Sequence, residues 1–576
     1  MDKQITNRVS ILLLVFIVLG IYYPAIFAPL NSIDDPGMCQ YLLNTDTFSL
    51  RDIFSPGESG TYYRPLLMAS FILDKYAWGL EESFMHLDNV VFHLCNTLLL
   101  FAVARRVSRL LKINSPLPAF LAALFFAIHP LNTESVNWIS GRTDLLAGFF
   151  IILSVYLLIG ASRSSRASLL AALSLLLACL AKDTAIFFLP AAIMLPLFIP
   201  DEEGERAPLR LTAVNSIPHF LVFTVAGAGY FVFRALAFSK GDAGVRQVMT
   251  HVAGSQGAGL LPSLRLVLKS AGFYVKKLFI PFPLNFGIFH VSDLYIIVAV
   301  LLCITIVWLL MRRTLTGFFF IAAAAVGSSA LLIPLLKMTW TPLAERYMYV
   351  PSAFFLVGMT FALYQWERRV RWQKFTASVI AAVAAVAMIG TAQRNFLWQD
   401  NLALFEDCRR QSPDFVPAQN EMANALYARG NNREAIAIIT SMELPEDLNN
   451  RQYGLISKAA ALVNAGDYAG SRTILKQTLA APGKHEVLIL QHLLQLNDME
   501  GMSRKADLVK FQSDNVHLLS RLYAITGDTF YLYRLGQVYM FQGDRAQARD
   551  AFSRVAALAP EHAFYRQAAR KLSKKM

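Results

Sequence analysis

The sequence predicts an all-α protein, in which a polytopic membrane domain of about eleven transmembrane helices precedes a solenoid of helical repeats. Two observations predict this fold class. Hydrophobic residues make up 55% of the 576 residues and charged residues only 16%, with 41 phenylalanines, which is more apolar material than a soluble core needs. From about residue 398 the chain turns polar and amphipathic instead. We therefore expect a membrane domain at 1–395 and a repeat domain at 396–576.

Apolar runs near the length that crosses a bilayer, roughly 17 to 25 residues, follow one another through the first domain. The first run has no small-residue cleavage site after it, so we expect a retained signal anchor and not a cleaved signal peptide. The predicted spans are 11–30, 87–104, 117–133, 143–160, 167–181, 184–200, 211–236, 290–311, 316–336, 347–366 and 375–393.

The basic residues predict the orientation of these spans. The net charge of +13 comes from clusters in alternate loops, which are topology signals and not a nucleic-acid site. The positive-inside rule then puts the N-terminus in the cytoplasm and the repeats outside. The apolar segment 261–287 would reverse the later loops if it crossed, so we expect an amphipathic surface helix or a re-entrant segment there. The outer loops are then 31–86, 237–289 and 337–347.

Ionisable residues gather in these outer loops and beside the ends of the spans. Such groups are costly near a membrane and are usually paired or functional. An Arg142–Asp144 or Glu134–Arg142 pair that only joins two helices is the structural alternative, and a Lys or Arg can also snorkel to the interface. The candidate residues are Asp34, Asp35, Arg64, His129, Glu134, Arg142, Asp144, Lys182, Asp183, Glu345 and Arg346.

Carboxylates and cations together at a membrane surface suit transfer from a lipid-linked phosphate donor. Arginine or lysine stabilises the phosphate that leaves, and a carboxylate takes the proton of the acceptor hydroxyl. The pair Asp34–Asp35 is the candidate base. Asp35 is slightly preferred, and which of the two takes the proton is left open. The five scattered cysteines predict neither a disulfide framework nor a zinc site. A paired Asp can bind a divalent cation, but no second carboxylate cluster requires a metal.

Glycine turns between amphipathic helices recur in the second domain. Gly430, Gly466 and Gly543 mark units at 425–439, 461–475 and 537–560, and the spacing leaves room for a degenerate unit near 485–515. This pattern is typical of tetratricopeptide repeats, whose period is about 34 residues. Such arrays offer a concave surface to peptides or partner proteins, although a solenoid that serves only as a spacer would have the same pattern.

Several motifs follow one another along the chain: "YYRPLLMASFILDKYAWG", "HLDNVVFHLCNTLLLF", "FAIHPLNTESVNWISGRTDLLA", "AKDTAIF", "LAERYMYVPS" and "QRNFLWQDNLALFEDCRRQSPDFVPAQNEMANALYARGN". In this order they resemble the transmembrane and tetratricopeptide-repeat-containing protein O-mannosyltransferases and their bacterial relatives. The resemblance covers essentially the whole chain.

The resemblance implies a GT-C-like glycosyltransferase that works without an obligatory metal. It would transfer a sugar, mannose by default, from a polyprenyl-phosphate carrier to Ser or Thr hydroxyls with inversion, at the outer face of a bacterial inner membrane. Asp34–Asp35 would match the catalytic acidic motif. The other roles implied are donor-phosphate binding by Arg142, Lys182 and Arg346, with Asp144 orienting Arg142, and a cavity lined by Arg64, His129, Glu134, Asp144, Asp183 and Glu345.

Departures from the family pattern leave the sugar and the acceptor open. Pro36–Gly37 follows the acidic pair where animal members mostly have a basic residue, and the repeat array is short. Two alternatives stay open. One is a non-catalytic membrane scaffold that recruits partners through its repeats, and the other is a GT-C enzyme that modifies a glycolipid or an oligosaccharide.

Overall fold

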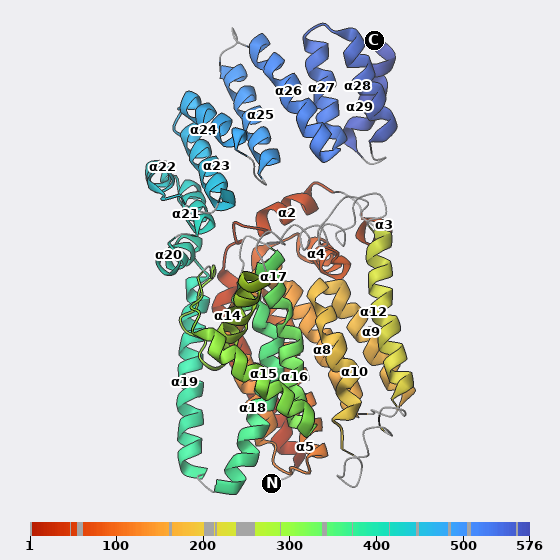
Figure 1. Cartoon of the computed structure of the whole chain (residues 1–576), viewed down its shortest axis with the longest axis vertical. Helices are drawn as coiled ribbons and strands as arrows, with labels where there is room; N and C mark the ends of the chain where they lie inside the picture. Colours follow the sequence, from red (N-terminus) through yellow and green to blue (C-terminus); the bar gives the residue numbers. More distant parts are fainter. Residues whose placement is uncertain are drawn as a thin grey trace. The chain divides into compact units, whose positions relative to one another are not determined.

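In the residues that the computed structural model describes, the regular elements are α- and 3-10 helices (Figure 1). The all-α prediction is confirmed, since in these residues the only β-type pairing is an isolated bridge between Ile288 and Leu343. The structure describes residues 3–45, 48–54, 62–160, 164–200, 212, 216–237, 260–288, 290–336, 343–370, 373–413, 415–444, 448–481, 485–503, 508–559 and 563–576. Much of the predicted outer segment 237–289 and half of 337–347 lie outside the described residues.

Two compact units divide the chain, Met1–Ser412 and Pro413–Met576. Helix α20 (Asn401–Gln411), which the predicted boundary assigns to the repeat domain, lies in the first unit. Its packing explains this. The Asn401 side chain donates to the Leu30 carbonyl, and the hydroxyl of Ser412 donates to the Gly287 carbonyl.

Long apolar helices form most of the first unit. Among the described residues, eight helices are long and apolar enough to cross a membrane, and a bent pair is a ninth. The eight are built on α1 (Lys3–Tyr22), α5 (Glu82–Leu110), α8 (Arg142–Gly160), α12 (Ile217–Ala237), α15 (Tyr295–Arg312), α16 (Leu315–Gly327) with α17 (Ser329–Leu336), α18 (Tyr349–Val370) and α19 (Gln373–Leu397).

The bent pair joins α6 (Leu117–Ala127) to η2 (Pro130–Asn132) and α7 (Thr133–Asn137) at an angle of 47°. Two shorter apolar segments follow α8, namely α9 (Ser165–Ala181) and the run Asp183–Leu197. These segments fall on the predicted runs, but the count of eleven spans stays a prediction. The run 183–197 consists of η4 (Asp183–Phe188), α10 (Leu189–Met194) and η5 (Leu195–Leu197).

The segment predicted to be an amphipathic helix forms α14 (Leu260–Phe279), which is not among the candidate spans. It packs closely on α15 because Gly272 has no side chain: a Cβ there would lie 1.8 Å from the Tyr295 carbonyl oxygen. Small residues allow helices in membrane proteins to approach in this way. Its location relative to a membrane stays a prediction.

Short helices complete one end of the first unit, where they connect the long helices. They shape the loops that carry most of the candidate residues. The remaining elements are η1 (Tyr23–Phe27), α2 (Asp35–Leu43), α3 (Leu50–Phe54), α4 (Pro65–Trp78), η3 (Ile139–Gly141) and η7 (Glu345–Met348).

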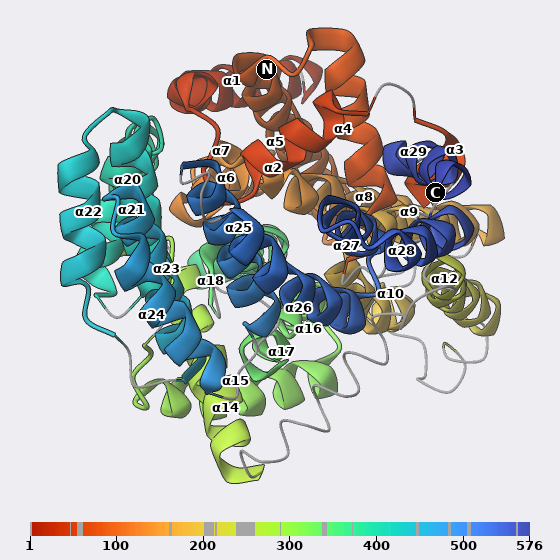
Figure 2. The same cartoon turned by 90° about the horizontal axis from the view of Figure 1, so that it is seen from above.

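The second unit is a series of antiparallel helix pairs, each helix packing on the next in chain order (Figures 1 and 2). The predicted glycine turns are explained by the backbone: Gly430, Gly466 and Gly543 have φ of 78°, 84° and 81°, a region that favours glycine. After two of these turns an aspartate caps the next helix: Asp467 accepts from the Gly470 amide, and Asp544 does the same for α28. The helices are α21 (Val416–Ala428), α22 (Asn432–Ser441), α23 (Leu448–Asn464), α24 (Tyr468–Ala480), α25 (Glu486–Ser503), α26 (Leu508–Thr526), α27 (Thr529–Phe541), α28 (Arg545–Leu558) and α29 (Phe564–Lys575).

Candidate active site

Asp35 is a completely buried carboxylate at the start of α2. One oxygen accepts hydrogen bonds from the amide and the hydroxyl of Ser140, at 3.1 and 2.6 Å, and the other accepts from the Asn31 amide at 3.0 Å. The η3 turn packs closely on α7 because Gly141 has no side chain: a Cβ there would lie 2.6 Å from the Ser135 carbonyl oxygen. Asp35 therefore fastens the first loop to the turn before α8.

Asp34, in contrast, is exposed. Partial desolvation raises the pKa of its carboxyl, and the guanidinium groups of Arg346 and Arg64 act in the opposite direction by favouring the charged form. The net shift is upward, which makes the carboxylate a stronger base. Of the acidic pair, Asp34 is the carboxylate that a substrate can reach.

Arg142 lies at the start of α8 with its side chain fully buried. Its three nitrogens donate to the Asp74 carboxylate at 2.7 Å, the Asn89 side-chain oxygen at 2.9 Å and the Met85 carbonyl at 2.9 Å. Neither predicted pairing of Arg142, with Asp144 or with Glu134, forms, so Asp144 does not orient it. The guanidinium is enclosed by protein groups in this structure, and its contact with a donor phosphate stays a prediction.

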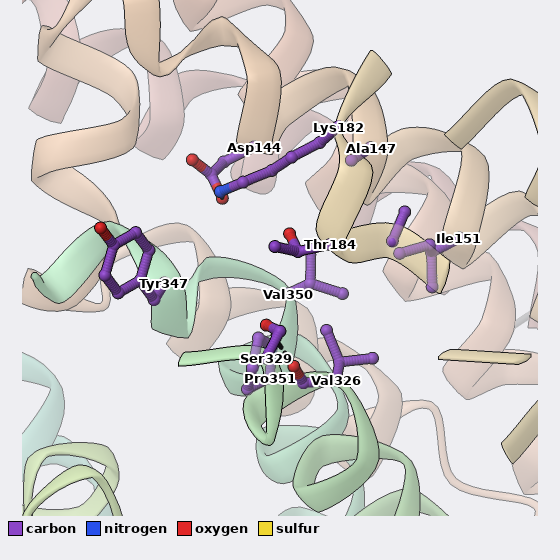
Figure 3. Close-up of a pocket in the computed structure, with 11 residues that line it drawn as sticks. Asp144, Ala147, Ile151, Lys182, Thr184, Val326, Ser329, Tyr347, Val350 and Pro351 are labelled. Atoms are coloured by element: carbon purple, nitrogen blue, oxygen red, sulfur yellow. Dashed lines mark hydrogen bonds and ion pairs between the residues drawn. The ribbon is translucent and has the colours of Figure 1, made fainter. Parts of the chain in front are cut away.

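Asp144 forms an ion pair with Lys182 instead, between α8 and the end of α9. Figure 3 shows the Lys182 amine directed at the Asp144 carboxylate at one side of a pocket, with Tyr347 nearby. Apolar side chains from α8, α16 and α18 form the opposite walls of the pocket. Its lining residues are Asp144, Ala147, Ile151, Lys182, Thr184, Ala185, Val326, Ser329, Tyr347, Val350 and Pro351.

Glu134 and Arg346 form a second ion pair. The Glu134 carboxylate also accepts from the Arg346 backbone amide at 3.0 Å, so Glu134 binds both the side chain and the backbone of Arg346. The guanidinium lies 4.9 Å from the ring centres of both Trp138 and Tyr347. Tyr347 thus borders both the Arg346 side chain and the pocket of Figure 3.

The Asp183 carboxylate contacts residues of both the first loop and α12. It accepts from the Tyr230 hydroxyl at 2.7 Å, pairs with Arg234 and lies 3.4 Å from the Nε atom of Arg64. The Arg64 side chain is 26% exposed, and its charge acts on Lys182 together with that of Arg346. Three cations, Arg64, Lys182 and Arg346, therefore lie within electrostatic range of one another.

The two remaining candidates have structural partners. His129 accepts from the Leu131 amide and, through its other ring nitrogen, hydrogen-bonds the Leu278 carbonyl at 3.3 Å. Glu345 is buried and pairs with Lys277 at 2.6 Å. Both therefore join α14 to the loops around η2 and η7. Among the described residues no group of three or more His, Cys, Asp and Glu could hold a metal ion.

Sequence reasoning missed several partners of the candidate residues. Asp74 lies beside Lys75 in α4, and Lys277 beside Lys276 in α14; a charge in a helix of a membrane domain is a signal that could have marked both as buried partners. Ser140 and Asn89 had no such signal, since their roles depend on which turn approaches them. The missed residues are Asp74, Asn89, Ser140, Tyr230, Arg234, Lys277 and Tyr347.

The buried carboxyl of Asp35 predicts a pH dependence of stability. Burial raises its pKa from 3.8 to about 6, because the hydrogen bonds from Ser140 and Asn31 only partly oppose the desolvation. A raised folded-state pKa means that the folded protein holds the proton more tightly than the unfolded chain does. The contribution of this group to stability is therefore complete below about pH 4 and is lost as the pH rises through about 6.

We expect the variant Asp35→Asn, which carries no charge at any pH, to lack this dependence. The difference in unfolding free energy between wild type and variant should change by on the order of 3 kcal/mol between about pH 4 and 7. Unfolding of both proteins in detergent across this pH range measures it. A difference that stays constant with pH would contradict the assignment.

The fold and this cluster of charges define a multi-helix membrane protein with a helical repeat unit, and the comparisons agree with both parts. A family model described as a tetratricopeptide repeat matches residues 529–562, which contain α27, the glycine turn at Gly543 and α28. The repeat type predicted from the glycine spacing is thus confirmed.

The chain is similar to human "Protein O-mannosyl-transferase TMTC4", with 23% identity over 66% of this chain and 58% of that protein. Mouse "Protein O-mannosyl-transferase TMTC1" is 39% identical over 16% of this chain and 9% of its own. "Protein O-mannosyl-transferase F38B6.6" of Caenorhabditis elegans is 25% identical over 33% of this chain and 26% of its own. The predicted resemblance is confirmed as a similarity, and the chain matches less than two thirds of the length of each of these relatives.

Proposed function

We propose that the chain is a membrane glycosyltransferase. It transfers a hexose, mannose by default, from a polyprenyl-phosphate carrier to Ser or Thr hydroxyls of proteins. The observation that carries this proposal is the exposed Asp34 carboxylate within electrostatic range of Arg346 and Arg64. These same cations act on Lys182, which lines a pocket with apolar walls. A base, a cationic surface and an apolar recess are what a lipid-linked phosphate donor requires.

In the proposed reaction Asp34 accepts the proton of the acceptor hydroxyl. The hydroxyl oxygen attacks the anomeric carbon from the side opposite the phosphate, a new C–O bond forms, and the sugar–phosphate C–O bond breaks with inversion. The electron pair leaves on the phosphate oxygen. Arg64, Lys182 and Arg346 stabilise that charge, because donors held in place by Asp183, Asp144 and Glu134 need little reorganisation as charge develops.

Asp35 and Arg142 have a different role in this proposal. Asp35 holds the loop of Asp34 against the η3 turn through Ser140. Arg142 directly follows this turn and is paired with Asp74. Both are positioning residues, because their polar atoms face protein groups. The charge distribution also supports an N-terminus in the cytoplasm and repeats on the opposite side, in the periplasm if the chain lies in a bacterial inner membrane.

Mass spectrometry of proteins exported from cells with and without the gene tests this function. We expect hexose to be lost from specific Ser or Thr peptides when the gene is deleted, and to return with the wild-type chain. If the peptides are unchanged and a glycolipid is altered instead, the acceptor is a lipid and not a protein. No glycan change at all would leave a scaffold role and refute transfer.

A further inference from the structure

A hollow of about 110 Å³ lies in the repeat unit where α23, α24 and α25 meet. Both polar and apolar side chains face it, and none of the lining residues is charged. The lining residues are Ala460, Val463, Asn464, Ser471, Leu475, His492, Gln495, Leu496 and Met499.

Polar groups in this hollow lack partners within the described residues. The Ser471 hydroxyl is fully buried and forms no hydrogen bond, which is costly unless a ligand or a water meets it. The side chains of Asn464, His492 and Gln495 also have no hydrogen-bond partner in the part of the chain that the structure describes. All four groups line the hollow, with Ser471 buried, His492 half-buried and Asn464 and Gln495 exposed at its edge.

The recess is also electrically neutral. Arg472, which follows Ser471 on α24, is paired with Glu500 and hydrogen-bonded to Asn497. Burial lowers the pKa of His492, so its imidazole is uncharged at neutral pH. A charged side chain would find no counter-charge here and would lose hydration on entry.

The apolar part of the lining gives the hollow a second property. Val463, Leu475 and Leu496 line it from three different helices, so an apolar group beside a polar one is accommodated. A helical repeat array binds extended segments on its surface, in which successive side chains point in opposite directions.

We propose that this hollow binds an uncharged extended peptide segment in which a hydroxyl-bearing side chain and an aliphatic one two positions away point to the same side, as in a Ser/Thr-rich acceptor. The hydroxyl meets Ser471, His492, Gln495 and Asn464, and the aliphatic group meets the apolar lining. The inference rests on the proposed function in that the bound segment is the stretch to be glycosylated. Acceptor selection then depends on the absence of charge near the Ser or Thr.

Peptide binding to the purified full-length chain in detergent tests this proposal by fluorescence anisotropy, with no sugar donor present. Three labelled peptides of equal length are compared: one of Ser, Thr, Val and Ala, one with Glu and one with Lys at alternate positions. We expect the neutral peptide to bind most tightly. The double variant His492→Ala/Gln495→Ala should weaken that binding by about tenfold, the effect of losing two hydrogen bonds.

The matched control is Gln477→Ala, since Gln477 is exposed on α24 outside the lining and should bind the peptide as wild type does. His492 and Gln495 are not fully buried, so the double variant, like the Gln477→Ala control, should unfold at the wild-type temperature. Equal binding of all three peptides, no binding of any, or full binding by the double variant would overturn the proposal. No sugar is transferred in this assay, so peptide binding and glycosyltransferase activity are tested separately. The peptide can bind even if the chain transfers no sugar, and the chain can transfer sugar even if this hollow does not bind the peptide.

Discussion

Replacing Asp34 by asparagine is expected to lower the rate of sugar transfer by about 10²- to 10⁴-fold, the usual contribution of a general base. Asparagine has nearly the same shape but cannot accept the hydroxyl proton at neutral pH. Because Asp34 is exposed, the variant should fold as wild type does. Transfer measured in membranes with equal amounts of the two proteins gives the ratio.

The control for this variant is Glu81→Gln, which neutralises another exposed carboxylate of the same predicted loop. Its rate should equal that of wild type. Wild-type activity in Asp34→Asn would show that another group takes the proton. An equal loss in both variants would show that the overall charge of the loop matters and not the position of Asp34.

Replacing Arg142 by alanine is expected to destabilise the protein by about 3–5 kcal/mol, the typical result of removing one partner of a buried ion pair. The change leaves the Asp74 carboxylate buried without its guanidinium partner, and the Asn89 side chain and the Met85 carbonyl lose a donor. A lower unfolding temperature in detergent measures this effect. Activity should fall in parallel with the folded fraction.

The double variant Arg142→Met/Asp74→Leu separates structural anchoring from a role in donor binding. Removing both charges leaves no unpaired carboxylate, so stability should recover in large part relative to Arg142→Ala. Wild-type stability in Arg142→Ala combined with a raised KM for the lipid-linked donor would contradict the structural role and would return Arg142 to the donor phosphate.

The fold class and the repeat turns could be predicted because their signals are local. A long apolar run has few alternatives to a helix at membrane length. Similarly, a glycine followed by an aspartate combines a left-handed C-terminal residue with a helix cap, as Gly466–Asp467 does. The basic clusters of the later loops predicted that 261–287 does not cross the membrane, and α14 is not among the candidate spans.

The pairing of the site residues could not be predicted, because it depends on contacts between distant segments. Glu134 and Arg346 are 212 positions apart, and Arg142 and Asp74 are 68 apart. The sequence places many opposite charges in neighbouring loops, and several pairings would satisfy electrostatics equally well. Only the packing of α4 against α5 and α8 makes Asp74, and not the nearby Asp144, the partner of Arg142.

Reconstitution of the purified chain into liposomes tests the central claim most directly. The liposomes contain a polyprenyl-phosphate hexose, and a neutral Ser/Thr peptide is added from outside; its mass is then followed by mass spectrometry. We expect the wild-type chain to add hexose to a hydroxyl of the peptide, and the Asp34→Asn chain to add almost none. No hexose on the peptide with either chain, or equal amounts with both, would contradict the proposed reaction.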